Sequence, residues 1–334
     1  MLTHVRACRA IFIMAVICYD EKPRNYTLSM PNIDLHSHST ISDGMLSPSR
    51  LLAHAAVRGV NVLALTDHDD IAGLSEASRS AQQENITLIR GVEISVTWHG
   101  RTLHILGLGI NPEHPPLTEG LKKIRDGRMD RARAIAAQLD KFGIHGSFEG
   151  ASAQAGTSRL IGRTHFARFL VSQGYARNVK SVFKKYLVKG KPGHVSHVWV
   201  SLDEAIGWIR GSGGQAVIAH PARYKLSNDL LEQLLREFRE LGGAGIEVVS
   251  SSHTPEQTRQ FAALATRMNL YASCGSDYHG PGESYFDLGR LPALPPECTP
   301  IWNEWEIPDY AETGATTLNE QSEQTGLQSP GKSV

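Results

Sequence analysis

Six segments of the chain place a histidine or a carboxylate where a predicted β-strand ends. In chain order these segments supply His36 and His38 with Asp43, then His68, Glu93, His104 and His220, and finally Asp277 with His279. Each of these side chains is a common ligand of divalent cations. Packing alone does not explain so many of them, because buried ionisable groups need partners. The sequence therefore predicts a multi-metal site.

Short aliphatic or β-branched runs alternate with helical segments. Ser47 and Pro48 mark one helix start, and capping boxes at Ser201–Glu204 and Thr254–Gln257 mark two more. Ligands at the carboxyl ends of strands favour an α/β fold with a β/α barrel over an open doubly wound sheet. The predicted strands are 32–37, 60–66, 86–94, 101–107, 215–219, 245–250 and 270–274.

A helical and basic stretch interrupts this alternation. Residues 113–193 hold 16 Lys and Arg against 6 Asp and Glu, a net charge of +10, and the rest of the chain carries −10. The acidic part can hold cations and the basic part can attract anions. We therefore predict a discontinuous barrel domain, residues 30–111 and 194–300, with a small helical insertion domain, residues 112–193, whose helices span 117–142, 163–172 and 178–187.

The two ends of the chain lie outside this pattern. We expect residues 1–29 to be an N-terminal extension, disordered or the product of a misassigned start codon, because Met30 directly precedes the first strand. The apolar run 10–18 weakly resembles the core of a signal peptide, but charged residues follow it at once. The tail, residues 301–334, is rich in Thr, Gln, Ser, Gly and Glu, and we expect it to be disordered.

Composition also bounds the cellular setting. The four cysteines show no metal-type spacing, and no apolar run approaches the ~20 residues that span a bilayer. We therefore expect a cytoplasmic protein without membrane contact, and no protein partner is implied.

Strand periodicity suggests separate roles for the clustered residues. Residues two apart in a strand face the same way, so His36 and His38 line up. Asp34 shares their face, and we interpret it as a partner that orients an imidazole rather than as a ligand. Glu93 ends an apolar run, so its charge needs compensation, which a carboxylate that bridges two cations would receive.

These segments resemble the motifs of the PHP (polymerase and histidinol phosphatase) superfamily: HxH, TDH, a lone Glu, and separated His and Asp-x-His elements, in the expected order over residues 31–290. The resemblance implies a distorted (β/α)7 barrel that holds two to three divalent ions. Mixed imidazole and carboxylate ligands suit Mn²⁺, Zn²⁺ or Fe²⁺. Carried onto this sequence, the resemblance implies one ion at His36, His38, Glu93 and Asp277, a second at Glu93, His104 and His220, and a third at Asp43, His68 and His279.

This ligand set implies hydrolysis of a phosphate ester. Two ions about 4 Å apart can lower the pKa of a shared water enough to give hydroxide, which would attack phosphorus in line. The third ion would neutralise phosphate oxygens and the leaving group. His253 follows the sixth strand, and we consider it either a proton donor to the leaving oxygen or a neighbour of the next helix cap.

Arginines in the insertion point to a second anion site. Arg128 and Arg131 occupy positions of a helical stripe that otherwise calls for aliphatic residues, which favours an anion-facing side over snorkelling. Arg163 and Thr164 open the next helix, whose free amides favour phosphate. The apolar members of the stripe are Leu117, Leu121, Ile124, Ile135, Leu139 and Phe142.

Two anion sites imply a substrate with two phosphates or a phosphodiester. The insertion resembles the PHP subgroup of nucleoside 3′,5′-bisphosphate phosphatase, in which the metals remove the 3′-phosphate, the arginines hold the 5′-phosphate, and the product is a nucleoside 5′-monophosphate. A 5′→3′ exoribonuclease acting on short RNA is the first alternative, although 7% aromatic residues disfavour an extended RNA platform.

Three further classes are less favoured. A histidinol-phosphate-type phosphatase would leave the arginines without a purpose. A metal-dependent amidohydrolase usually has a bridging modified lysine, and no lysine ends a predicted strand. A polymerase-associated binding module would not need a full ligand set.

Overall fold

Seven strands form one sheet whose spatial order follows the chain, and they confirm the predicted strands. The computed structural model describes residues 31–156 and 160–305. Strand β4 runs antiparallel to β3 and β5, and the other neighbouring pairs are parallel. Within the described residues the strands are β1 (Ile33–Asp34), β2 (Val62–Leu65), β3 (Thr87–Trp98), β4 (Arg101–Leu108), β5 (Gln215–Ile218), β6 (Gly245–Ser250) and β7 (Tyr271–Gly275).

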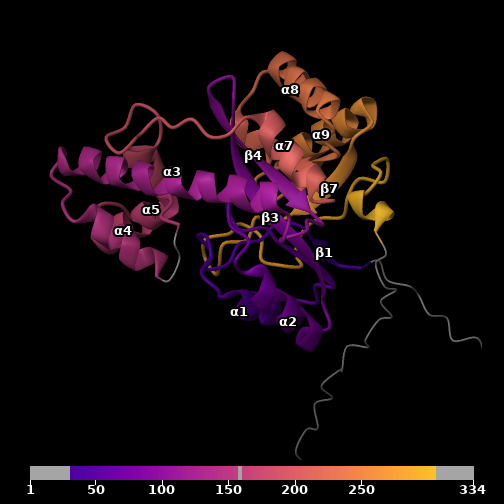
Figure 1. Ribbon diagram of the computed structural model, residues 1–334, viewed down its shortest axis with the longest axis horizontal. Coiled ribbons are helices and arrows are strands. Elements are labelled where there is room, and N and C mark those ends of the chain that lie inside the picture. The colour runs from indigo at the N-terminus through magenta and orange to yellow at the C-terminus, as the bar shows by residue number, and fades with distance from the viewer. Residues whose placement is uncertain (1–30, 157–159, 306–334) are drawn as a thin grey trace, which may run out of the picture. The chain divides into compact units, whose positions relative to one another are not determined.

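The sheet curls until its first and last strands meet. The amide of Leu35 donates to the carbonyl of Cys274 at 2.9 Å, and the amide of His38 donates to the carbonyl of Tyr278 at 2.9 Å. The closure therefore continues past the two residues of β1, along the segment that carries the HxH motif. The result is the expected distorted (β/α)7 barrel, nearly closed, with the central strands visible in Figure 1.

The distortion originates in the β3–β4 hairpin. His99 and Gly100 connect the two strands, with φ angles of 46° and 71°. Positive φ at both turn residues suits the twist of a tight hairpin. A direct hairpin leaves no room for a crossover helix, so β4 must run antiparallel to β3.

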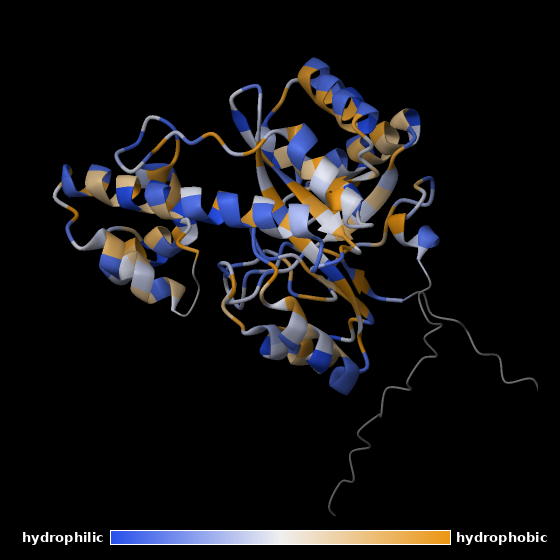
Figure 2. Cartoon of the chain, in the orientation of Figure 1, coloured by the Kyte–Doolittle hydropathy of each residue, from blue (hydrophilic) through white to orange (hydrophobic). Residues whose placement is uncertain are grey.

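Helices on the barrel begin where the sequence predicted. Ser47 accepts a hydrogen bond from the amide of Arg50, and capping boxes open the helices after Ser201 and Thr254. Apolar residues gather in the strands, and α8 shows both apolar and polar residues along its length (Figure 2). The barrel helices and short turns are α1 (Pro48–Val57), α2 (Leu74–Glu84), α7 (Leu202–Gly211), η2 (Pro221–Tyr224), α8 (Asn228–Glu240), α9 (Pro255–Met268) and η3 (Ile301–Glu304).

The insertion has a small core of its own. Buried residues of this core include Ile135 and Leu139 from its long first helix and Phe166 and Leu170 from a later one. The predicted helices are present, although Phe142 is 61% exposed, so the apolar stripe stops before it. The insertion contains α3 (Pro115–Asp140), α4 (Ser147–Ala155), α5 (Arg163–Ser172), α6 (Val179–Val182) and η1 (Phe183–Leu187). The sequence did not reveal α4, because its Ala, Gly and Ser residues form no clear stripe.

Helix α3 belongs to both the barrel and the insertion. Figure 1 shows it reaching from the sheet to α4 and α5. Near its start, Gly120 lies so close to the ring of Trp208 on α7 that an added Cβ would stand 2.6 Å from the ring. The barrel therefore holds one end of α3, and the core of the insertion holds the other.

Order extends slightly beyond the predicted start of the tail. Ile301 is fully buried in η3, and the indole nitrogen of Trp305 donates to Gln215 at 2.7 Å. The tail boundary expected at residue 301 was therefore too early, because residues 301–305 pack on the barrel. The expected extension, residues 1–29, and residues 306–334 lie outside the described residues. None of the helices in residues 31–156 and 160–305 has the length and hydropathy needed to cross a bilayer.

Two helical glycines provide a matched test of the insertion. A Cβ on Gly150 in α4 would lie 2.1 Å from the ring of Phe169 in α5, whereas nothing lies within 4 Å of a Cβ on Gly207 in α7. We expect Gly150→Ala to lower the free energy of unfolding by about 1–3 kcal/mol through overpacking. Gly207→Ala should raise it by about 0.5–1 kcal/mol through helix propensity. Urea denaturation measures both, and equal stabilisation would contradict the α4–α5 packing.

Candidate metal centre

Glu93 lies at the centre of the predicted ligands. It is fully buried in β3, between the end of β2 and strand β4. One carboxylate oxygen, Oε1, lies 2.8 Å from Nδ1 of His104 and 2.9 Å from Nε2 of His220. These three residues are the predicted ligands of the second ion, and the structure brings them together.

The other oxygen of Glu93 faces a different set of imidazoles. Oε2 lies 3.3 Å from Nε2 of both His36 and His38, and 2.9 Å from Nδ1 of His68. Although Oε2 and Nδ1 of His68 are close, they are not aligned for a hydrogen bond, and both are buried without such a partner among the described residues. Two oxygens that serve two sets of nitrogens are what a bridging carboxylate requires.

Asp277 completes the first group of donors. Its Oδ1 lies 3.4 Å from Nε2 of His36 and 3.1 Å from Nε2 of His38, and these two nitrogens are themselves 3.1 Å apart. The ligand atoms of His36, His38, Glu93 and Asp277 all lie within 4.8 Å of one another. This group matches the predicted ligands of the first ion.

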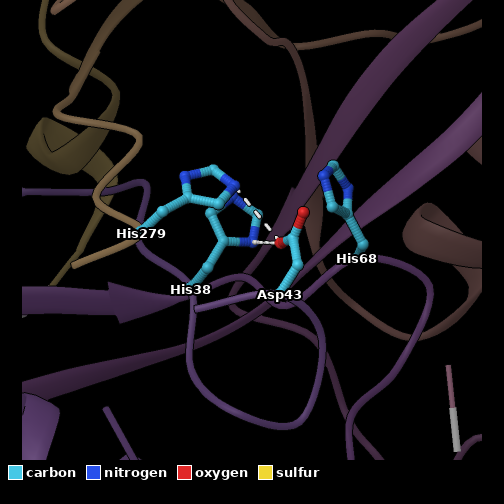
Figure 3. Close-up of side chains that lie close together, drawn as sticks. All are labelled: His38, Asp43, His68 and His279. Carbon is cyan, nitrogen blue, oxygen red and sulfur yellow. Dashed lines mark ion pairs between the residues drawn. The ribbon is translucent and has the colours of Figure 1, made fainter. Parts of the chain in front are cut away.

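The third group lies beside the first and is shown in Figure 3. Asp43 Oδ1 is 3.2 Å from Nε2 of His279 and 3.9 Å from Nδ1 of His38. His68 completes this group within the same 4.8 Å limit. The structure therefore places His38 beside the three residues predicted for the third ion, because its two ring nitrogens face different groups. All nine predicted metal ligands lie in one cluster.

The chemistry of the buried carboxylates and imidazoles in this cluster suits divalent cations. Burial opposes ionisation of Glu93, yet the charges of His68, His104 and His36 outweigh it and hold the pKa of this carboxyl well below its usual range. The pKa values of Asp43 and Asp277 are likewise held low, although burial opposes ionisation of both. Buried anions with unpaired oxygens are costly unless cations meet them. Imidazoles mixed with carboxylates suit transition ions.

Three residues at this cluster also have a positive φ angle, which L-residues rarely adopt. His220 and Asp277 have φ angles of 27° and 53°, and Asp69, next to His68, has a φ of 50°. Such conformations cost about 1–3 kcal/mol each and persist where the surroundings enforce them. The strain identifies the ends of β2, β5 and β7 as sites where side-chain placement overrides backbone preference.

Glu247 on β6 orients one of the imidazoles, and the sequence analysis missed it. Nδ1 of His36 donates to its Oε1 at 2.8 Å, which leaves Nε2 of His36 free to face the cluster. A Cβ on Gly275 would stand 2.2 Å from Cβ of His36 and 2.6 Å from Oε1 of Glu247, so only glycine fits there. The detectable signal was a charged residue inside the apolar strand 245–250.

Asp34 does not have the orienting role that we expected. Its Oδ1 accepts hydrogen bonds from the backbone amides of Ser276, at 2.9 Å, and His36, at 3.4 Å. Burial raises the pKa of this carboxyl to about 6. Asp34 therefore fixes the backbone between β1 and β7 rather than an imidazole ring.

Asp67 fixes the loop that carries Asp43. Its carboxylate accepts hydrogen bonds from the amide of Ser39 at 2.8 Å and from the hydroxyls of Ser39 and Ser42 at 2.6 Å and 2.5 Å. The aspartate of the TDH motif thus holds one loop in place while His68 beside it faces the donor cluster.

Arg128 was predicted to face a substrate anion, but it is buried and already bonded to an anionic side chain of the protein. Its Nε donates to Oδ2 of Asp69 at 2.5 Å, and its Nη2 donates to the hydroxyl of Ser95 at 2.8 Å. The amide of Asp69 in turn donates to the carbonyl of Glu93 at 2.9 Å. Arg128 therefore ties α3 to the strand ends that carry the donors.

Arg131 and Arg163 are the less compensated cations. Burial, together with the nearby charges of Arg163 and Arg128, lowers the pKa of Arg131 to about 9, and its Nε is buried without a hydrogen-bond partner in the described part of the chain. Burial and Arg128 also lower the pKa of Arg163, whereas Asp43 opposes this shift. Arg163 thus lies near both the arginines and the third donor group. Thr164 follows it in the first turn of α5, where backbone amides lack helical partners.

Aromatic rings flank these arginines. The guanidinium carbons of Arg128 and Arg131 lie 4.7 Å and 5.3 Å from the centre of the Trp199 ring, and that of Arg163 lies 5.5 Å from the Phe183 ring. Rings that cover guanidinium faces leave their edges, which carry the N–H donors, for an anion.

His253 is not brought to the cluster. Its Nδ1 donates to the carbonyl of Val248 at 3.0 Å. The centres of the His253 and Phe261 rings lie 4.7 Å apart. Burial lowers the pKa of His253 to about 4. A neutral ring whose proton is held by a carbonyl is poorly suited to protonate a leaving group, so the geometry does not support that predicted role.

Arg223 is a second residue that the sequence analysis missed. Its guanidinium pairs with Oδ2 of Asp277, and it is 47% exposed at the mouth of the cluster. The detectable signal was its position in the turn directly after His220 and Pro221.

Comparison with known proteins places this geometry in a family. The family model of the PHP domain matches residues 34–251. The chain belongs to the PHP family. A 3′,5′-nucleoside bisphosphate phosphatase from Chromobacterium violaceum is 51% identical to this PHP chain over 277 residues, 83% of this chain and 97% of the relative.

Two further proteins resemble this PHP chain over a similar share of its length. The 5′-3′ exoribonuclease Rnm of Escherichia coli K12 is 43% identical over 279 residues, which cover 82% of this chain and 94% of the relative. A solved structure described as an amidohydrolase from Chromobacterium violaceum, with bound sulfate and no metal, superposes with a TM-score of 0.80 at 51% identity. That superposition covers 82% of this chain and 95% of the other.

The buried pair of Arg128 and Asp69 allows a direct test of the link between insertion and barrel. We expect Arg128→Met or Asp69→Asn alone to lower the free energy of unfolding by about 3–5 kcal/mol, because each leaves its partner as an uncompensated buried charge. The double variant should recover most of that loss. Chemical denaturation of the three variants measures the coupling, and additive losses would contradict the pairing.

Proposed function

We propose that this PHP protein is a metal-dependent phosphatase. It removes the 3′-phosphate from nucleoside 3′,5′-bisphosphates and leaves nucleoside 5′-monophosphates. The observation that carries the proposal is the closeness of two unlike sites. One is the donor cluster around Glu93, and the other is the less compensated pair Arg131 and Arg163.

Two phosphates on one ribose fit this pair of sites. Arg128 bonds to Asp69, the residue after His68, and the charges of Arg128 and Asp43 both act on the pKa of Arg163, so the arginines lie near the third donor group. A 5′-phosphate held by Arg131, Arg163 and the first-turn amides of α5, which include that of Thr164, would direct the 3′-phosphate to the donor cluster. The phosphatase from Chromobacterium violaceum, at 51% identity, supports this substrate class.

We propose that His36, His38, Glu93 and Asp277 hold one divalent ion and that Glu93, His104 and His220 hold a second. Asp43, His68 and His279, with His38, hold a third. Mn²⁺, Zn²⁺ and Fe²⁺ all suit these ligands. When bound, such ions supply Lewis-acid activation of water and neutralise phosphate oxygens.

The residues of the chain supply the positioning. Glu247 keeps the proton of His36 on Nδ1, so that Nε2 faces inward. Arg223, paired with Asp277 at the mouth, places a positive charge where a phosphate would enter. Free thiols at Cys274 and Cys298 are consistent with our proposal that the protein acts in the cytoplasm.

A 5′→3′ exoribonuclease activity on short RNA is the second candidate. The similarity to the Escherichia coli exoribonuclease, at 43% identity, favours it. The same arginines would hold the 5′-phosphate of an RNA, with the first internucleotide phosphate at the donor cluster. The two candidates differ only in whether the scissile phosphate carries a further nucleotide.

The proposal predicts a selective loss in Arg131→Met. Wild-type protein loaded with Mn²⁺ should release phosphate from adenosine 3′,5′-bisphosphate with a much higher kcat/KM than from adenosine 3′-monophosphate. Arg131→Met should lower kcat/KM for the bisphosphate by about 10- to 100-fold, because it removes a charged hydrogen bond to the 5′-phosphate. The kcat/KM for the monophosphate should be nearly unchanged.

Lys141→Met, an exposed substitution at the end of α3, is the matched control. Equal losses on both substrates in Arg131→Met would remove Arg131 from the 5′-phosphate site. Absence of phosphate release in wild type, with release of mononucleotides from 5′-phosphorylated RNA, would favour the exoribonuclease.

A further inference from the structure

Arg168 of α5 bonds to two barrel loops at once. Its Nε and Nη2 donate to the two carboxylate oxygens of Glu283 at 2.8 Å and 2.7 Å. The same Nη2 donates to the backbone carbonyl of Asp43 at 2.7 Å. The Arg168 side chain is 12% exposed; its bond to the carbonyl of Asp43 is partly buried, and its two bonds to Glu283 are exposed.

The two loops carry residues of the third donor group. Asp43 lies on the loop after β1, and His279 lies on the loop after β7, four residues before Glu283. The loops are also bonded to each other, because the amide of Met45 donates to the carbonyl of His279 at 2.7 Å. The amide of His279 donates to the hydroxyl of Ser284 at 2.7 Å, which joins it to the segment that holds Glu283.

This group depends more on loop placement than the group of Glu93, His104 and His220 does. Glu93 and His104 are held within the long strands β3 and β4 by ladder hydrogen bonds. Asp43 and His279 have no such ladder, so their separation depends on what holds their loops: Asp67 on the side of Asp43, and the contacts between the two loops. A bidentate guanidinium–carboxylate pair fixes both distance and orientation, which a single point charge would not do.

We propose that Arg168 is a positioning residue for the third donor group, and that the insertion thereby sets the affinity of the third cation. This inference rests on the proposed function, because it requires that the third donor group holds a cation. Helix α5 also carries Arg163, which we place at the 5′-phosphate. One helix therefore joins the distal phosphate site to the loops of the third cation.

The test combines metal binding with kinetics. Equilibrium dialysis against Mn²⁺, with elemental analysis, gives the number and affinity of bound ions for wild type, Arg168→Lys, Arg168→Met and Glu283→Gln. We expect Arg168→Met to retain the two ions around Glu93 and to bind the third about 10- to 100-fold more weakly. The kcat should fall at subsaturating Mn²⁺ and recover at high Mn²⁺, with a smaller change in KM.

Arg267→Met is the matched control. Arg267 forms an ion pair with Glu232 between α9 and α8 and has no contact with the donor cluster within the described residues. It should bind Mn²⁺ as wild type does. Arg168→Lys keeps the charge but cannot form the bidentate pair, so it should lie between wild type and Arg168→Met, and it decides the case if Arg168→Met does not fold.

The outcomes separate this inference from the proposed function. Three ions bound with unchanged affinity in Arg168→Met and Arg168→Lys would overturn the positioning role. Wild-type protein that is active with only two ions would overturn it also and leave the phosphatase proposal intact. Wild-type protein that binds no transition ion would overturn both.

Discussion

The carboxylate of Glu93 is the interaction on which the rest of the site depends. It is fully buried, and its two oxygens face nitrogens of five histidines. Those histidines come from the segments after β1, β2 and β5 and from β4 itself. One carboxylate can meet all of them because the sheet curls towards Glu93. The bonds from Leu35 to Cys274 and from His38 to Tyr278 close the curled sheet, so the barrel and the donor cluster are parts of one constraint.

The insertion is joined to this cluster by charged side chains rather than by packing alone. Arg128 of α3 bonds to Asp69, the residue after His68, and Arg168 of α5 bonds to the loops of Asp43 and His279. Arg131 and Arg163 are left with less compensation. The arginines of the basic segment thus divide into those that hold the insertion on the barrel and those available to an anion.

Much of this arrangement could be predicted from the sequence, and the remainder required distances. All nine clustered residues were predicted because strand periodicity and motif order identify residues that face the same end of a barrel. Glu247 was missed because a lone glutamate in a strand has no local partner, and its contact with His36 joins residues 211 positions apart. Arg128 and Arg131 look alike in the helical stripe. Only the structure shows that Asp69 is bonded to Arg128.

The most direct test of this account is a crystal structure of the Mn²⁺-loaded protein with anomalous scattering measured near the manganese edge. The account predicts three anomalous peaks, two of which lie about 3.5–4 Å apart, one beside each carboxylate oxygen of Glu93. One peak of this pair should be ligated by His36, His38 and Asp277, and the other by His104 and His220. A single peak, or peaks that leave Glu93 outside ligand distance, would contradict the shared carboxylate and the barrel-centred site built on it.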